Sequence, residues 1–443
     1  MTTISVFDST IYRDLFHDAE IGQIFSDAAE IRAMLCVEGA LAAAQGSLGV
    51  IPETSAAAIR RACLDARIDP AALTRGTGRS AVCVPALVAA LREKIGDPQL
   101  AQHVHWAATS QDIIDTGLMI RLRQVLAIYD TRLVTLLKGL GELARIHAEL
   151  PMAARTWAQV ATPTSFGAIA AGWGRPFLSH RVRLDQLRPR LLQVSLSGAS
   201  GTLSAMGERG PAIRTALAEG LGLADPARSW HSAREGLAEF AAWLTAVSGS
   251  LAKMGADLIG MTQGGIEEVA LGSVGGSSTM PQKTNPVLPN LLVALAGHTA
   301  ALNSPMQTAL VHRQQRDGAA WMLEWMALPQ MCMAVARALT AATELAGSMR
   351  PDPHNMRASI DGGFGLIYAE ALCFALADHM PRPEAQTRVK SLCTEARETG
   401  TSLADLVRRD FPDLDVETVF RAEAQLGVAP EEAHAFAERI QGL

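Results

Sequence analysis

Between Leu237 and Met261, apolar residues recur at alternating steps of three and four positions. They are Leu237, Phe240, Leu244, Val247, Leu251, Met254, Leu258 and Met261. This is the spacing of a coiled-coil seam, so it predicts a long helix that must bury one face against neighbouring helices. A chain with this seam is therefore constrained to a bundle of long helices.

Two further patterns extend the same prediction. From Ile114 an apolar stripe recurs at helical spacing through Leu118, Leu122, Leu126, Tyr129, Leu133, Leu137 and Leu140. A third run, from Leu291 to Leu302, is apolar almost all round and is therefore expected to be central. Alternating β-branched runs bounded by turn residues are nearly absent. We therefore predict an all-α fold with a central bundle of long helices.

The length of the chain predicts more than one domain. With 443 residues, the chain is too long for one compact core, and 49% hydrophobic but only 5% aromatic residues favour packed aliphatic helices. We expect breaks at Ile51-Pro52 and at 76–80 (GTGRS) within the first domain, and Pro351-Asp352-Pro353 near the start of the last. The predicted domains are an N-terminal helical domain (1–105), a central long-helix bundle (106–345) and a C-terminal helical domain (346–443).

Charge and cysteine usage exclude several classes of protein. A net charge of −6 without a Lys/Arg run longer than two predicts no nucleic-acid partner. The first 18 residues lack the pattern of a signal peptide, which predicts a cytoplasmic protein. The longest uncharged stretch, 284–311, is interrupted by prolines and polar residues, so we expect a buried helix and no membrane span. Six scattered cysteines without a CxxC pair predict neither a zinc site nor a disulfide framework.

The stretch 272–289 (GSVGGSSTMPQKTNPVLP) is too rich in Gly, Ser and Pro for regular structure, and a loop of this length is typically functional. The hydroxyl of Ser277, the cation of Lys283 and the amide of Asn285 suit an anionic, oxygen-rich substrate. Composition alone is equally compatible with a plain linker.

The order of residues 276–286 (GSSTMPQKTNP) resembles the GSSxMPxKxNP signature of the fumarase/aspartase superfamily of lyases. The resemblance implies that Ser277 is the catalytic base and that Lys283 and Asn285 stabilise charge on a substrate carboxylate. Removing a proton α to a carboxylate builds a doubly charged aci-carboxylate, so a cation and donors are needed there. The same motif supplies further candidates for substrate binding, Ser278 and Met280.

A second segment, 105–116 (HWAATSQDIIDT), resembles the HWGxTSxDxxDT region of the superfamily, with Ala107 where Gly is usual. The resemblance implies that Thr109 and Ser110 bind a substrate carboxylate and that His105 is a candidate proton donor, with Gln111 beside them. Capping the first long helix is an alternative role for the two hydroxyls and is compatible with binding. The helix N-terminus is itself an anion site.

The third segment, 154–167 (ARTWAQVATPTSFG), resembles the superfamily's GRTHxQxAxPxTFG stretch, which implies that Thr156, Trp157 and Gln159 bind substrate. Many relatives pair the His of this motif with an acidic residue after the loop. Here Trp157 and Asn290 stand at those positions, so that relay cannot be carried over. Tryptophan here is typical of the 3-carboxy-cis,cis-muconate cycloisomerase branch. A core-filling Trp157 is the alternative.

Other segments resemble the same branch: 24–27 (IFSD), 201–211 (GTLSAMGERGP), 229–234 (SWHSAR) and Glu324-Trp325 before 327–329 (ALP). Within them the planar guanidinium of Arg234 predicts a carboxylate clamp, and Arg316 matches an arginine of relatives. Four positions are small or apolar where the branch is often polar, which leaves the substrate open: Gly22, Val160, Ala233 and Gly265.

The resemblance predicts a cofactor-independent cycloisomerase acting on a small polycarboxylate. No metal or organic cofactor is expected, because the substrate's own carboxylate is the electron sink and HExxH, P-loop and GxGxxG elements are lacking. One alternative is a lyase that eliminates an amine or nitrite from a substituted succinate to release fumarate. Another is an inactive helical binding protein. The resemblance also implies a homotetramer whose active sites are shared between three subunits.

Overall fold

The computed structural model describes residues 4–272, 275–276 and 279–443. The chain divides into two compact units. Unit 1 comprises Met1–Thr131, His180–Ser248 and Leu295–Ala338, and unit 2 comprises Arg132–Ser179, Gly249–Ala294 and Leu339–Leu443. The division into three domains at 105 and 345 stays a prediction.

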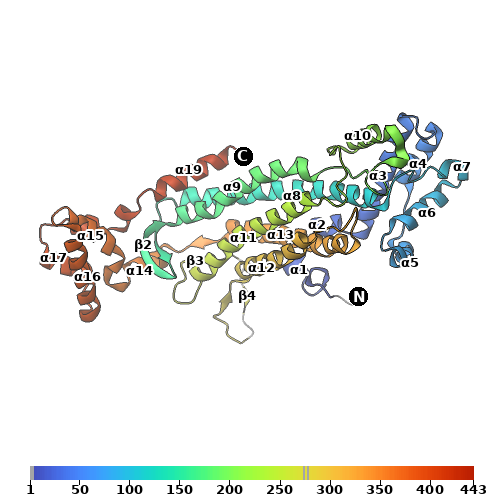
Figure 1. The fold of residues 1–443 in the computed structure, drawn as a ribbon. Coiled ribbons are helices and arrows are strands. Elements are labelled where there is room, and N and C mark those ends of the chain that lie inside the picture. Colours follow the sequence, from blue (N-terminus) through green and yellow to red (C-terminus); the bar gives the residue numbers. More distant parts are fainter. Residues whose placement is uncertain (1–3, 273–274, 277–278) are drawn as a thin grey trace. The chain divides into compact units, whose positions relative to one another are not determined.

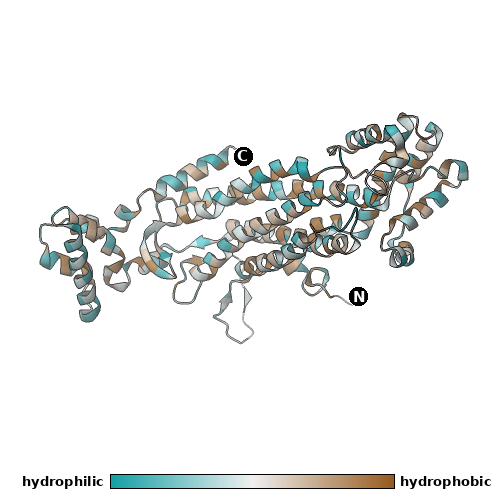
Figure 2. Ribbon diagram, in the orientation of Figure 1, coloured by the Kyte–Doolittle hydropathy of each residue, from teal (hydrophilic) through white to brown (hydrophobic). Residues whose placement is uncertain are grey.

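Long helices dominate the fold, which confirms the all-α prediction (Figure 1). They are α8 (Ser110–Ile146), α9 (Phe166–Leu191), α11 (Glu235–Met261), α12 (Val287–Thr308) and α13 (Gly318–Ser348). The stripe from Ile114 lies on α8, and the strict seam coincides with α11. Each of the eight seam residues of α11 is buried, from Phe240 at 0% exposure to Met261 at 7%. Teal and brown residues alternate along these helices in Figure 2, as amphipathic packing requires.

Helix α12 was expected to be central because it is apolar almost all round. Within this chain it buries Leu291, Leu292 and Leu295, whereas Val293 remains 40% exposed. One apolar face of α12 is therefore open in the single chain.

The N-terminal region contains one longer helix, α3 (Asp27–Ser47), and several shorter helices. The shorter helices are α1 (Arg13–Phe16), α2 (Ala19–Ile24), α4 (Glu53–Asp65), α5 (Pro70–Ser80), α6 (Val84–Ile95) and α7 (Pro98–Ala101). Helix α4 begins directly after Pro52, as expected. Another helix of unit 1, α10 (Gly210–Leu221), comes later in the chain. The break predicted at 76–80 was wrong, because α5 continues through these residues to Ser80 and is capped by Ala81, whose φ is 62°. A Cβ at Gly76 would lie 2.8 Å from the Ala86 Cβ, so this glycine permits close packing of α5 on α6.

Two glycines of α5 offer a matched test. Gly76→Ala is expected to destabilise the protein by about 1–2 kcal/mol, because the added methyl overpacks against Ala86. Gly78→Ala is expected to stabilise it by about 0.5–1 kcal/mol, since open space surrounds Gly78 and alanine favours the helix. Chemical denaturation of both variants measures the difference. Equal effects of the two would contradict the close-packing role of Gly76.

Short antiparallel strand pairs were not predicted. They are β1 (Pro151–Thr156) with β2 (Gln159–Ser165), β3 (Val269–Ala270) with β6 (Arg350–Pro351), and β4 (Gly275–Gly276) with β5 (Thr284–Asn285). The last pair lies in the stretch 272–289, which was expected to lack regular structure. Gly275 pairs with Asn285 and Gly276 with Thr284. The pair therefore fixes both ends of the signature loop.

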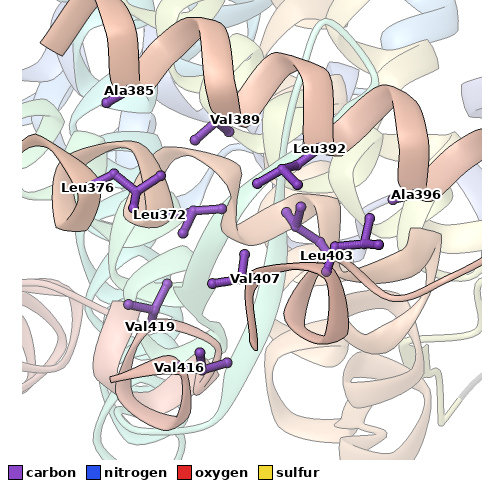
Figure 3. Close-up of a cluster of buried hydrophobic side chains, with 11 residues drawn as sticks. Leu372, Leu376, Ala385, Val389, Leu392, Ala396, Leu403, Val407, Val416 and Val419 are labelled. Atoms are coloured by element: carbon purple, nitrogen blue, oxygen red, sulfur yellow. The ribbon is translucent and has the colours of Figure 1, made fainter. Parts of the chain in front are cut away.

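The C-terminal part of unit 2 has its own apolar core. Its elements are α14 (Pro353–Asp361), α15 (Ala369–Ala377), α16 (Arg382–Thr399), α17 (Leu403–Asp410), α18 (Val416–Val419) and α19 (Ala429–Gln441). Figure 3 shows Val389 and Leu392 of α16 directed toward Leu372 of α15 and Val407 of α17. Among the described residues, no single helix is long and apolar enough to span a membrane. One bent pair of helices, Pro353–Asp361 with Gly363–Ala377, meets both criteria together.

Candidate active site

The N-terminus of α8 in unit 1 is organised by Asp112. Its carboxylate accepts a hydrogen bond from the Thr109 backbone N–H at 2.9 Å, so the side chain caps its own helix. This bond is made by the Asp112 carboxylate, and the capping role considered for the Thr109 and Ser110 hydroxyls stays a prediction. Both residues are half-buried at the helix end, where N–H groups and the helix dipole favour an anion.

The same carboxylate ties two loops to the helix end. Asp112 accepts from the backbone N–H of Ser197 at 2.8 Å and of Gly198 at 3.1 Å. His231 Nε2 lies 2.8 Å from Asp112 Oδ1 and, because a carboxylate only accepts, carries the proton. Asp112 is 0% and His231 2% exposed. These buried bonds fix the segments that follow α9 and precede α11.

Arg234 lies between two buried carboxylates. Its guanidinium donates to Asp115 at 2.6 Å and to Glu324 at 2.5 Å, and the side chains are no more than 2% exposed. Burial lowers the pKa of Arg234, but the two carboxylates outweigh burial and raise that pKa above its ordinary value. The donors of Arg234 are therefore not available to a substrate carboxylate in this structure, in contrast to the clamp expected from the sequence. The geometry favours a positioning role.

Gln111 connects this ion cluster to Arg316. The Gln111 amide donates to Asp115 at 3.1 Å and to the His231 carbonyl at 2.9 Å, and its oxygen accepts from Arg316 Nε at 2.6 Å. Gln111 is fully buried and held by its own hydrogen bonds, so its oxygen is a fixed acceptor that orients the Arg316 guanidinium. Arg316 also donates to the Ala199 carbonyl at 3.3 Å, which leaves further N–H donors at a half-buried position. Arg316 is thus the arginine of this cluster that can meet a carboxylate.

His105 is held by a buried glutamate of α3. Its Nδ1 lies 2.7 Å from Glu38 Oε1, and the side chains are 18% and 1% exposed. Because a carboxylate only accepts, Nδ1 is the donor and Nε2 is left for proton transfer. His105 and Ala107 have φ of 64° and 59°, the left-handed region that explains why Gly is usual at position 107. Backbone strain of this kind often accompanies functional sites.

In unit 2, the β1–β2 hairpin presents the third segment. Thr156 pairs with Gln159, so Trp157 and Ala158 form a two-residue turn, and their φ values are 52° and 60°. Trp157 is 99% exposed, so the core-filling alternative was wrong. Thr156 and Gln159 are also exposed on this turn. Arg155 anchors it through two 2.8 Å bonds to the buried carboxylate of Glu268.

The signature loop also belongs to unit 2. Lys283 and Met280 are exposed, Asn285 is half-buried on β5, and the Lys283 N–H donates to the Met280 carbonyl at 3.0 Å. Ser277 and Ser278 lie outside the described residues. A Cβ at Gly275 would meet Val287 Cγ2 at 2.6 Å, so glycine is required where the hairpin approaches α12.

Two departures from the branch have a local explanation. A Cβ at Gly22 would lie 2.5 Å from the His17 ring, so this histidine occupies the space where relatives often carry Arg. Gly265 has a φ of 85°, a conformation that glycine adopts without strain. Nothing in the structure explains Ala233. Among the described residues, no group of three or more His, Cys, Asp or Glu side chains is arranged to hold a metal ion.

A family model described as Lyase matches residues 17–299. This chain belongs to the fumarase/aspartase superfamily of lyases. It is 40% identical to 3-carboxy-cis,cis-muconate cycloisomerase of Pseudomonas aeruginosa over 393 residues, which cover 88% of this chain and 86% of that one. The crystal structure of 3-carboxy-cis,cis-muconate lactonizing enzyme from Pseudomonas putida superposes with a TM-score of 0.92 at 34% identity, covering 98% and 99% of the chains.

A fumarate lyase from Mesorhizobium sp. BNC1 is similar as well, with a TM-score of 0.90, 34% identity, and 96% and 98% of the chains covered. These likenesses confirm the superfamily, the fold and the resemblance to the cycloisomerase branch. They also confirm an enzyme of this superfamily, so the inactive binding protein is not retained.

Sequence reasoning missed the buried acids that hold the site. Asp112 and Asp115 were noted only as part of the motif 105–116, and no structural role was predicted for them. Two carboxylates on the buried face of α8 nevertheless need partners. Glu38 is a lone charge in the apolar run 33–44 (AMLCVEGALAAA). A charge isolated in such a run was the available signal for a buried partner.

Proposed function

We propose that this enzyme is a 3-carboxy-cis,cis-muconate cycloisomerase. The observation that carries the proposal is similarity over nearly the whole chain to enzymes of that name, together with Trp157 on the exposed turn. One carboxylate oxygen of the substrate adds to a conjugated double bond, and the adjacent carbon takes a proton. The reverse reaction is a β-elimination with a carboxylate leaving group.

In the proposed mechanism, charge builds on the substrate carboxylate next to the carbon that gains or loses the proton. Thr109 and Ser110 at the N-terminus of α8, with Arg316 held by Gln111, form a carboxylate site in unit 1. Lys283 and Asn285 supply a cation and an amide from the signature loop. Ser277 is the proposed base that takes the α proton in the elimination direction and returns a proton to the same carbon in the addition direction, and His105 is the candidate donor that restores the proton to Ser277.

The missing His–Glu relay agrees with this chemistry. A relay that protonates a departing alkoxide or amine is needed because those leaving groups are strong bases. A carboxylate is a weak base and departs without a proton. With Trp157 and Asn290 at the two relay positions, the chain therefore lacks a proton relay that lactone formation does not require. The similarities to cycloisomerases favour this reaction over the alternative elimination of an amine or nitrite from a substituted succinate.

The proposed activity is tested by incubating the purified protein with 3-carboxy-cis,cis-muconate and following the loss of diene absorbance. Turnover to a muconolactone is expected. No turnover, with fumarate released from an amino- or nitro-substituted succinate, would overturn the proposal.

Glu38→Gln tests the role of His105. The amide keeps the size of Glu38 but no longer fixes Nδ1 as a donor, so kcat is expected to fall about 10- to 100-fold with little change in KM. The pH dependence of kcat should change as well, which loss of packing alone would not cause. Glu93→Gln, an exposed glutamate on α6, is the control. Unchanged kcat in Glu38→Gln would remove Glu38 from the mechanism.

We further propose that the enzyme is a cytoplasmic homotetramer with active sites shared between three subunits. The open apolar face of α12 supports the assembly, because Val293 is 40% exposed in the single chain. Light scattering of the purified protein should give four chain masses. A monomer that retains full activity would contradict shared sites.

A further inference from the structure

Two segments that the catalytic assignment does not use meet at one cavity of unit 1. Residues 24–27 contribute Phe25, and the segment that follows Glu324 contributes Trp325, Leu328 and Pro329. The cavity has a volume of about 240 Å³. Its remaining walls are Glu30 of α3, Glu324 of α13, and Ile114, Leu118 and Arg121 of α8.

Arg121 is the unusual member of this cavity. The residue is 7% exposed, and its Nε is buried without a hydrogen-bond partner among the described residues. Nη1 lies 3.4 Å from Glu30 Oε2, and the guanidinium carbon lies 5.5 Å from the centre of the Phe25 ring. Burial lowers the pKa of Arg121. A buried guanidinium N–H without an acceptor is costly, so an acceptor from a ligand would stabilise Nε.

Apolar space adjoins this charged pair. A second cavity of about 500 Å³ shares Glu30, Ile114 and Trp325 with the first. Its other walls include Ile31, Met34, Leu73 and Val82. The two cavities therefore adjoin at Glu30, Ile114 and Trp325, and one contains the charged pair of Arg121 and Glu30 whereas the other is mainly apolar.

The balance of charge identifies the class of ligand. The residues that line the two cavities include three acids, Glu30, Glu324 and Asp27, and one cation, Arg121. Of these acids, Glu324 already accepts hydrogen bonds from Arg234, which also donates to Asp115. This excess of acid disfavours a simple anion, whereas an amine alone would leave Arg121 without an acceptor. A ligand with adjacent carboxylate and ammonium groups matches the adjacent Arg121 and Glu30.

We propose that this cavity binds an α-amino acid with an apolar side chain. Its carboxylate accepts from Arg121, its ammonium donates to Glu30, and its side chain fills the apolar cavity beside Trp325. The site is distinct from the proposed substrate site, because it uses neither Thr109, Ser110 nor the signature loop, and Glu324 is the residue that it shares with the Arg234 ion cluster.

Isothermal titration of the full-length protein with L-phenylalanine tests the proposal. L-Phenylalanine should bind, and 3-phenylpropionate and phenethylamine, which each lack one charged group, should bind at least about tenfold more weakly. Binding of 3-phenylpropionate as tight as that of L-phenylalanine would overturn the zwitterion assignment. No binding of L-phenylalanine would overturn the site.

Variants locate the site. Arg121→Met and Glu30→Gln should each weaken L-phenylalanine binding at least about tenfold, whereas Arg145→Met, an exposed arginine of the same helix, should not. Because Arg121→Met can affect folding, its melting curve is recorded, and Glu30→Gln gives an independent result at a half-exposed side chain. Lys283→Met should leave binding intact. Binding that survives Glu30→Gln but is lost in Lys283→Met would place the ligand in the catalytic site and overturn the proposal.

Discussion

Lys283→Met is expected to lower kcat/KM by about 10²- to 10³-fold. A group aimed at charge that develops in the transition state typically supplies a factor of this size. The aci-carboxylate carries two negative charges where the substrate carries one, so a cation contributes more to the transition state than to the bound substrate. The loss should therefore fall mainly on kcat.

The position of Lys283 supports this expectation. The β4–β5 pair fixes both ends of the loop, and Gly275 lies against Val287 at the start of α12. Lys283 itself is exposed. Steady-state kinetics of Lys283→Met, Lys283→Arg and the control Lys390→Met, on α16, make the test. Lys283→Arg should retain part of the activity because it keeps the charge, and a Lys283→Met enzyme with normal kcat would exclude the proposed role.

The long helices could be predicted from sequence because their burial is periodic. The seam of α11 and the stripe of α8 repeat over many turns, and each repeat adds support to the same helix. The break predicted at 76–80 failed because glycine has two uses. It ends helices, but it also lets helices approach, and only the position of Ala86 distinguishes the two.

The β1–β2 hairpin escaped prediction for a related reason. Hairpins with two-residue turns are recognised by Asn-Gly or similar pairs, because both turn residues have positive φ. Here Trp157 and Ala158 occupy that turn with φ of 52° and 60°. The strain is therefore not visible in the residue types, whereas the motif resemblance did identify Trp157 as a candidate for substrate binding.

Motif resemblance also placed Gln111 and Arg234 among the candidate residues but could not assign their surroundings. Asp115, Arg234 and Glu324 are far apart in the chain, and their pairing depends on how α8, α11 and α13 pack. The periodicity of apolar residues predicts that such positions are buried, but it does not predict which charged side chains pair with one another. The change in the interpretation of Arg234, from clamp to positioning residue, follows from that pairing.

Arg234→Met is expected to lower the free energy of unfolding by about 3–5 kcal/mol. Removing one partner of a buried ion cluster leaves uncompensated charge, which costs far more than the cluster itself contributes. Asp115 and Glu324 are at most 2% exposed and would both lose their cation. Trp230, whose ring lies 4.8 Å from the guanidinium carbon, would lose its packing partner as well.

Arg228→Met is the matched control, because Arg228 is 57% exposed and pairs with an equally exposed Glu235. That pair should contribute at most about 1 kcal/mol.

The loss of stability in Arg234→Met should also depend on pH. Burial raises the pKa of Glu324, and the loss of Arg234 removes the cation that otherwise lowers this pKa. A group with a raised folded-state pKa contributes stability at low pH that is lost as pH rises, so the variant should be more destabilised at pH 8 than at pH 5. Chemical denaturation at both values measures this, and a pH-independent loss equal to that of Arg228→Met would refute the buried cluster as the source.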